Sequence, residues 1–241
     1  MYRDSIGIVG GFGGYATLDF FKNLLDEFHT GYERDYPRIC MDNDFSMPSR
    51  TKVLLEDLEE DYNVIVKSIS NSIGWLIQGG CTHIILACGT AHNFLPAVYM
   101  LHPEYKKYVH NIIEITRDYL MEHHFNEVFI LAAEGTLKTR IYNSFFEEHN
   151  IITNAPKECE YKELRCFIES VKQNKIDRKT GEDFIEFLER YGKPNVILGC
   201  TEFPVLISEI KKYNEIANKL NEYKFINPLE LTIMKLKETI Q

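Results

Sequence analysis

The chain has 241 residues, of which 44% are hydrophobic and 26% are charged. These are ordinary values for a globular protein with a substantial core, so the composition does not suggest a disordered chain. The formal net charge of −9 disfavours nucleic acid or an anionic membrane as a partner, because both bind basic surfaces. A small molecule is the expected partner.

The first part of the chain reads as apolar strands that alternate with amphipathic helices, a pattern that predicts a parallel sheet with crossover helices. In chain order, the expected elements are a strand (5–9), a glycine-rich turn (10–14), a helix (15–29), a strand (38–41), a helical region after residues 47–50, a helix (63–79) and a strand ending at Cys88.

After a polar break over residues 101–107, the same order of elements begins again. The expected elements are a helix (111–122), a strand (127–131), a glycine-containing turn (132–136) followed by a helix, a helix (183–191), a strand ending at Cys200, and an apolar helix that reaches Ile240 and folds back on the first half. The repetition indicates a diverged internal duplication.

We therefore predict an α/β fold with two pseudo-symmetric domains, each with a mainly parallel sheet flanked by helices. The first domain is expected to comprise residues 1–110 and 211–241, and the second residues 111–210.

The cellular setting follows from the amino-terminal sequence and the cysteines. Residues 1–5 run directly into the first strand, without an apolar stretch that fits a signal peptide or membrane span, so a cytoplasmic location is expected. Six cysteines in such a chain indicate reduced thiols. No C-x-x-C pair is present, and Cys88 and His92 lack further nearby donors, so no metal site is expected.

Two of the cysteines share one local context. Cys88 and Cys200 each follow an apolar strand and precede a turn that contains a threonine, Thr90 or Thr201. The carboxyl end of a buried parallel strand is where open α/β sheets bind ligands. Two thiols placed in this way can act as acid and base in moving a proton, whereas a single buried cysteine is usually structural. The other cysteines lack this context and are predicted to be inert: Cys40, Cys81, Cys159 and Cys166.

Five ordered motifs resemble those of the aspartate/glutamate racemase superfamily. They are residues 10–17 (GGFGGYAT), 47–50 (MPSR), 87–92 (ACGTAH), 135–139 (GTLKT) and 198–204 (LGCTEFP). The match covers nearly the whole chain, and the glutamate at position 202 and the glycine-rich first turn place it nearer the aspartate racemases. The resemblance implies a cysteine pair, Cys88 and Cys200, facing across an interdomain cleft, no cofactor, and a homodimer. It implies PLP-independent racemisation of an acidic amino acid, aspartate before glutamate.

The resemblance also implies a set of substrate-binding residues. Arg50 would bind a carboxylate, which its guanidinium fork matches in a bidentate manner. Lys172 corresponds to a lysine for the side-chain carboxylate, with Lys179 as a rival. Thr90, Thr136 and Thr201 would form hydrogen bonds to the substrate; the alternative is that they are ordinary helix caps. The full expected set is Gly11, Phe12, Arg50, Gly89, Thr90, Thr136, Lys172, Thr201 and Glu202.

Two positions depart from the family pattern. Gly89 stands where the family has an asparagine whose amide is expected to bind the substrate carboxylate, and Asn227-Pro228 stands where an aspartate is frequent. Glu202 and His92 are expected either to tune the thiols or to be a helix-start acid and a packed histidine.

Other functions stay open at this level. Gly11-x-Gly13-x-x-Ala16 after a strand fits a dinucleotide-binding fingerprint, with Asp42 or Asp44 after the second strand. A non-catalytic or repurposed family member that binds a small dicarboxylate is a second alternative. A cis–trans isomerase or decarboxylase of a small dicarboxylate is a third.

Overall fold

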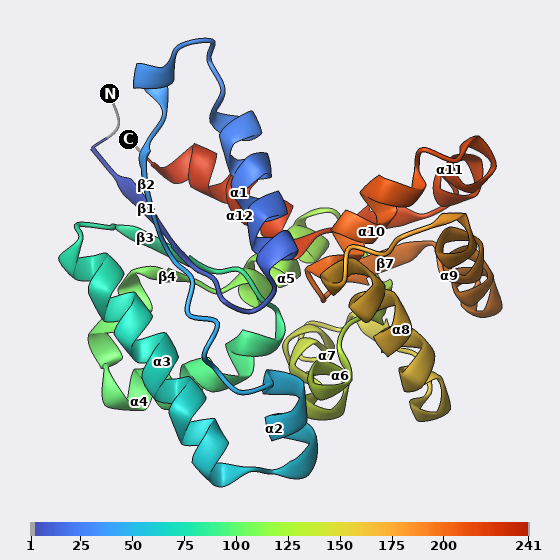
Figure 1. Ribbon diagram of the computed structural model, residues 1–241, viewed down its shortest axis with the longest axis horizontal. Coiled ribbons are helices and arrows are strands. Elements are labelled where there is room, and N and C mark those ends of the chain that lie inside the picture. The colour runs from blue at the N-terminus through green and yellow to red at the C-terminus, as the bar shows by residue number, and fades with distance from the viewer. Residues whose placement is uncertain (1–2, 241) are drawn as a thin grey trace.

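Each half of the chain forms a four-stranded parallel sheet flanked by helices (Figure 1). The computed structural model describes residues 3–240. The first sheet has the order β2-β1-β3-β4, with β1 Ser5–Val9, β2 Arg38–Asp42, β3 His83–Leu86 and β4 Val109–His110. The second has the order β6-β5-β7-β8, with β5 Glu127–Leu131, β6 Ile152–Asn154, β7 Asn195–Leu198 and β8 Lys224–Ile226. The predicted fold class is confirmed.

The helices of the two halves cover these sheets. Before β5 in the chain they are α1 Gly14–Phe28, α2 Arg50–Glu56, α3 Glu59–Gln78, α4 Leu95–Leu101 and α5 Ile112–Glu122. After β5 they are α6 Glu134–Thr139, α7 Ile141–Glu147, α8 Tyr161–Lys172, α9 Arg178–Tyr191, α10 Glu202–Ile210, α11 Asn214–Leu220 and α12 Pro228–Thr239. A short 3₁₀ helix, η2 (Thr90–Phe94), follows the Cys88 turn.

The inner strands are apolar because helices cover both faces of each sheet. All five residues of β1 are buried, as are the last three residues of β3 and of β7. Strands buried on both faces read as continuous apolar runs without alternation, which is why the sequence identified them. The outer strands are shorter or more exposed.

The carboxyl-terminal segment differs in part from the predicted domain division. Residues 211–226 were expected in the first domain, but β8 pairs with β7 in the second sheet, with Val196 opposite Phe225. A three-residue strand carries too little periodicity to be recognised. The following helix, α12, packs against α1 and α5 as expected for a tail that returns to the first half (Figure 1).

The two halves are joined by packed side chains as well as by the chain. One cluster of buried apolar side chains contains residues of both halves, among them Ile8 of β1, Leu120 of α5 and Ile197 of β7. Such continuous packing resists independent movement of the two sheets. The carboxyl ends of the strands in the two sheets are therefore held in a defined relation.

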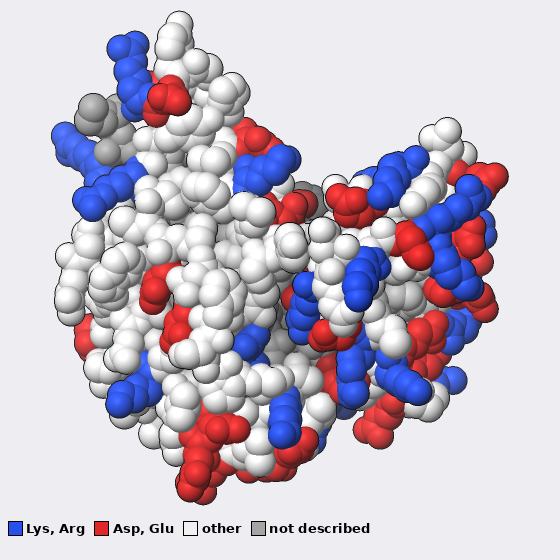
Figure 2. Space-filling view, in the orientation of Figure 1, with Lys and Arg blue, Asp and Glu red and all other residues white. Residues whose placement is uncertain are grey.

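The distribution of surface charge agrees with the expectation that the protein has no basic surface for nucleic acid or an anionic membrane. Figure 2 shows Lys and Arg side chains interspersed with Asp and Glu where the second half of the chain forms this face, without a large basic patch. None of the helices that the structure describes combines the length and apolar character that a membrane span needs.

Candidate active site

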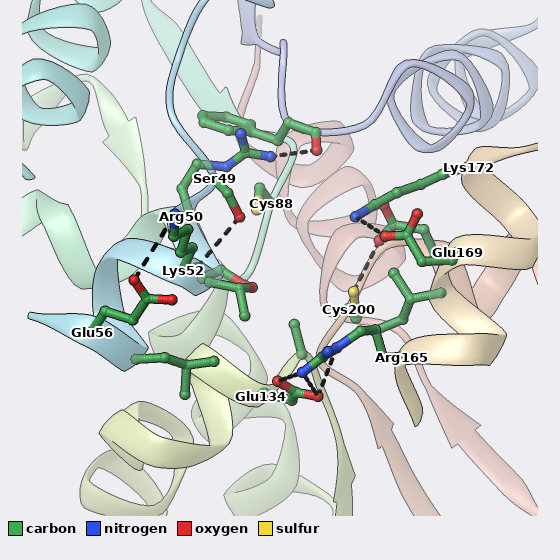
Figure 3. Close-up of a pocket in the computed structure, with 17 residues that line it drawn as sticks. Ser49, Arg50, Lys52, Glu56, Cys88, Glu134, Arg165, Glu169, Lys172 and Cys200 are labelled. Carbon is green, nitrogen blue, oxygen red and sulfur yellow. Dashed lines mark hydrogen bonds and ion pairs between the residues drawn. The ribbon is translucent and has the colours of Figure 1, made fainter. Parts of the chain in front are cut away.

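A cavity of about 290 Å³ lies between the two halves, and both predicted cysteines line it (Figure 3). Its size is at the lower end of ligand sites and suits a small molecule. The lining residues are Phe12, Ser49, Arg50, Thr51, Lys52, Leu55, Glu56, Cys88, Thr90, Ala133, Glu134, Arg165, Ile168, Glu169, Lys172, Cys200 and Glu202.

The duplicated topology brings the two thiols to this cavity. Cys88 follows β3 and Cys200 follows β7, which occupy equivalent positions in the two sheets. At the carboxyl ends, Val9 pairs with Leu86 and Leu131 pairs with Leu198, so each cysteine turn lies beside a turn that follows the first strand of its sheet. Figure 3 shows the two thiols on different sides of the cavity.

Positive charge and amide groups surround the Cys88 thiol. Burial raises the pKa of Cys88, while the Arg50 guanidinium and the backbone N–H groups of Ala91 and Thr90 oppose that rise. The Glu202 carboxylate adds to it. The amide groups at the start of η2 and the guanidinium are the features that favour a thiolate.

A carboxylate adjoins the Cys200 thiol. Cys200 Sγ donates a hydrogen bond to Glu202 Oε2 at 2.9 Å, and the two residues are only 8% and 5% exposed. Burial raises the pKa of Cys200 well above its usual value, and the Glu202 carboxylate raises it further. The two thiols therefore differ, since Cys88 has groups that favour its ionised form and Cys200 is held protonated by Glu202.

Arg50 is held in place by neutral groups. Its Nη2 donates to the Phe12 carbonyl at 2.5 Å and its Nη1 to the Pro48 carbonyl at 3.3 Å, with the guanidinium 5.2 Å from the centre of the Phe12 ring. Within residues 3–240 no ion pair to Arg50 is found. The Arg50 guanidinium, held beside Cys88 by neutral groups, is suited to bind an incoming carboxylate.

The other lining cations lie next to acidic side chains. Lys52 is 3.9 Å from Glu56, Arg165 is 2.6 Å from Glu134, and Lys172 is 3.1 Å from Glu169. Burial lowers the pKa of Lys172, but the Glu202 and Glu169 carboxylates outweigh this effect and raise it overall. Lys172 stays charged near Cys200, whereas its rival Lys179 pairs with Asp183 on α9 and does not line the cavity.

Arg165 and Glu134 are site residues that the sequence analysis missed. Arg165 donates to both oxygens of Glu134, which is only 7% exposed at its side chain. Residues 165, 168, 169 and 172 of α8 all line the cavity, at the spacing of one helix face. A helix prediction over residues 161–172, combined with the assignment of Lys172 to the site, would have placed Arg165 on the same helix face.

Four residues of the expected substrate-binding set do not line the cavity: Gly11, Gly89, Thr136 and Thr201. Thr136 Oγ1 is 2.7 Å from Thr90 Oγ1, so this pair links the second half to the Cys88 turn. Thr201 precedes α10, and Gly11 has φ of +80°, with the Asp44 carbonyl 2.2 Å from where a Cβ would lie.

The space next to Gly89 is filled by the other cysteine turn. A Cβ at position 89 would lie 2.3 Å from the Gly199 carbonyl oxygen and 3.1 Å from Tyr142 Oη. Real Cβ atoms do not approach backbone so closely, so a side chain at this position forces the two turns apart. Direct contact between the Cys88 and Cys200 turns therefore leaves no room for the asparagine that the resemblance led us to expect at this position.

His92 is a packed histidine that supports the Cys88 turn. Its Nδ1 lies 2.9 Å from the Cys88 carbonyl, and its Nε2 accepts from the Ile112 amide at 3.4 Å. Burial lowers its pKa to about 4, so it is neutral at physiological pH. Both ring nitrogens are engaged by the backbone, which leaves neither for a metal or a substrate.

The contacts of the glycine-rich turn (residues 10–14) do not suit a bound dinucleotide. A Cβ at Gly13 would lie 2.7 Å from Glu202 Oε1, and the Gly11 amide donates to Asn43 Oδ1 at 2.9 Å. A pyrophosphate needs free amides and no adjacent carboxylate. These contacts disfavour the dinucleotide alternative.

The remaining cysteines do not line the cavity. Cys159 and Cys166 are exposed, and Cys81 is buried with its pKa raised to about 12, chiefly by burial. Their placement is consistent with the expectation that they are inert.

Comparison with known proteins identifies the family. A family model described as Asp/Glu/Hydantoin racemase matches residues 9–222. The chain is 26% identical over 215 residues to a glutamate racemase of Aquifex pyrophilus, covering 86% of this chain and 74% of that protein.

Comparison with solved structures gives the same family. An aspartate racemase of Picrophilus torridus has a TM-score of 0.78 at 29% identity, covering 96% of this chain and 93% of that one. A glutamate racemase of Francisella tularensis in complex with D-glutamate has a TM-score of 0.69 at 19% identity, covering 98% and 80%. The chain therefore belongs to the Asp/Glu/Hydantoin racemase family, which confirms the family and the racemase class predicted from the sequence.

Proposed function

We propose that this protein racemises a small acidic amino acid, aspartate before glutamate, by proton transfer between Cys88 and Cys200 without PLP. The observation that carries the proposal is the placement of both thiols on one cavity, at equivalent strand ends of the two halves, beside Arg50, which makes no ion pair within residues 3–240. The aspartate racemase and the D-glutamate-bound glutamate racemase that the chain resembles support an acidic substrate. We also expect a homodimer.

The unequal thiols favour the starting state of one direction of the reaction, with Cys88 as the thiolate and Cys200 as the thiol. In one direction the Cys88 thiolate takes the α-proton: an S–H bond forms, the Cα–H bond breaks, and its electron pair remains on the substrate, shared between Cα and the carboxylate. Cys200 then gives its thiol proton to the opposite face of Cα and becomes the thiolate. In the other direction Cys200 is the base and Cys88 the acid, and exchange of protons with solvent restores the starting state.

Charged groups around the cavity suit the two carboxylates of such a substrate. Arg50 beside Cys88 binds the α-carboxylate and stabilises the charge that develops when the proton leaves. Lys172 and Arg165 on α8 face the cavity from the other half and receive the side-chain carboxylate (Figure 3). The Glu202 carboxylate keeps the proton on Cys200 and attracts the α-ammonium.

The substrate is tested with chiral chromatography. The purified protein is incubated with L- and D-aspartate, L- and D-glutamate, and L-alanine as a neutral comparison. Aspartate of either hand is expected to approach a 1:1 mixture, and glutamate to follow more slowly. No inversion of either acidic amino acid would refute the proposal.

The pH dependence follows from the two thiols. Cys88 must lose its proton to act as base, and burial raises its pKa above the ordinary thiol value of about 8.5. From pH 6 to 8 we expect kcat/KM to rise about tenfold per pH unit, because it tracks the thiolate fraction. It then falls at higher pH, where Cys200 also ionises. A profile that is flat between pH 6 and 8 contradicts this assignment.

Arg50 is predicted to act through substrate binding. Arg50→Gln is expected to raise KM roughly 10- to 100-fold, because hydrogen bonds to charged groups contribute about 1.5–3 kcal/mol. Arg50→Lys keeps the charge but loses the fork, so its KM lies between those of Arg50→Gln and the wild type. Steady-state kinetics measure both variants, with Lys179→Gln as the control outside the cavity. An unchanged KM in Arg50→Gln would exclude carboxylate binding by this residue.

A further inference from the structure

Tyr142 on α7 has an unusual hydroxyl. It is the one buried side-chain nitrogen or oxygen atom without a hydrogen-bond partner in the part of the chain from residue 3 to residue 240, and the whole residue is only 1% exposed. Buried hydroxyls without a partner are unfavourable and rare, so such an atom in a native core calls for an explanation.

The tyrosine lies against both cysteine turns. Its Oη would be 3.1 Å from a Cβ at Gly89, which directly follows Cys88. Its ring carbon Cε2 would be 3.0 Å from a Cβ at Gly199, which directly precedes Cys200. A side chain at either glycine would therefore meet the tyrosine, so the absence of both Cβ atoms allows the ring to occupy the seam between the turns.

The hydroxyl is also electrostatically coupled to both thiols. Burial raises the pKa of Tyr142, and negative charge on Cys88 or on Cys200 raises it further. It therefore keeps its proton at any working pH and acts as a donor. No hydrogen bond joins Oη to Sγ of either cysteine in the structure. A neutral thiol is a weak acceptor, whereas a thiolate is a strong one.

We infer that Tyr142 is a positioning residue of the thiol pair, whose hydroxyl donates a hydrogen bond to whichever of Cys88 and Cys200 carries the negative charge. This hydrogen bond requires the charged sulfur to turn toward the hydroxyl about its own Cα–Cβ bond. Because Tyr142 adjoins both turns, the same donor serves Cys88 while it is the thiolate and Cys200 after it has given up its proton. This inference rests on the proposed function only in assuming that one thiol of the pair is ionised.

The test measures thiol ionisation without substrate. Tyr142→Phe removes only the oxygen. The rate at which iodoacetamide alkylates Cys88 and Cys200 is followed against pH by mass spectrometry of the peptides. The pKa of the more reactive thiol is expected to rise by about one unit, which is a tenfold smaller thiolate fraction below that pKa. The acidic limb of the kcat/KM profile should move by the same amount.

Tyr99→Phe is the matched control. Tyr99 is partly buried and its pKa is raised to about 12, by burial and by Glu114 rather than by a thiol. Its replacement should leave the pKa of both thiols unchanged. The melting temperature of Tyr142→Phe should equal or exceed that of the wild type, because the variant loses a hydroxyl that has no partner.

An unchanged or lowered thiol pKa in folded Tyr142→Phe would overturn the inference. The alkylation data also separate it from the proposed function. A raised thiol pKa in a protein that inverts no acidic amino acid would retain the role of Tyr142 and refute the racemase substrate, whereas inversion with an unshifted pKa would do the reverse.

Discussion

Replacement of Cys88 or of Cys200 by alanine is expected to lower kcat by about 10²- to 10⁴-fold, the usual contribution of a positioned general acid or base. Each variant lacks one of the two groups needed to remove a proton from one face of Cα and return one to the other. KM should change little, because Arg50 and Lys172, the proposed ligands of the carboxylates, remain in place. Chiral chromatography in both directions measures the loss.

The controls for this prediction come from the other cysteines. Cys159→Ala changes an exposed thiol that does not line the cavity and should keep the wild-type kcat. The double variant Cys88→Ala/Cys200→Ala should be no slower than the slower single variant by more than a few fold, since the pair acts as one unit. A single variant that retains full activity would remove that cysteine from the mechanism.

Substitution of Gly89 is the second change with a large expected effect. Gly89→Asn restores the residue that the family has at this position, yet we expect it to reduce kcat about 100-fold, the order of loss that a displacement of 1 Å in a reacting group produces. The reason is the Gly199 carbonyl oxygen, 2.3 Å from the position of a Cβ, which is backbone and cannot rotate away. The Cys88 and Cys200 turns must separate, and the thiols with them.

The same substitution should destabilise the fold. Insertion of extra atoms into a packed contact costs about 1–3 kcal/mol, which urea unfolding detects. Gly14→Ala is the matched control, because its Cβ would lie 3.8 Å from the nearest atom, a carbon of Phe45. If Gly89→Asn gives an enzyme of normal kcat and stability, the two turns do not touch as described.

The parts of the fold that the sequence predicts are those with a strong local pattern. β1, β3, β5 and β7 are inner strands that helices cover on both faces, so their residues form apolar runs that end in recognisable turns. The cysteines at the ends of β3 and β7 were identified for this reason. The structure brings both to one cavity because the two halves repeat one topology.

Short outer strands were not predictable in this way. β4 has two residues and β8 has three, which is less than one period of any hydrophobic pattern. Their existence depends on the neighbouring strands β3 and β7. The assignment of residues 211–226 to the wrong half followed from the failure to recognise β8.

Side chains that act through tertiary contacts were also missed. Glu134 was seen only as part of a turn, and nothing local indicates that it pairs with Arg165 of α8. Tyr142 resembles any core aromatic residue until its contact with Gly89 is known. The reason for glycine at position 89 likewise lies in a residue far away in the sequence, Gly199.

The most direct test of the central claim, that one thiol removes the α-proton from one face of Cα and the other delivers a different proton to the opposite face, is deuterium incorporation in D₂O. Starting from L-aspartate, the early D-aspartate product should carry one deuterium at Cα, while the L-aspartate that remains carries much less. The Cys88→Ala and Cys200→Ala variants should form deuterated D-aspartate far more slowly than the wild type. Product that retains the original α-hydrogen throughout, or equal deuteration in the double cysteine variant, would contradict the account.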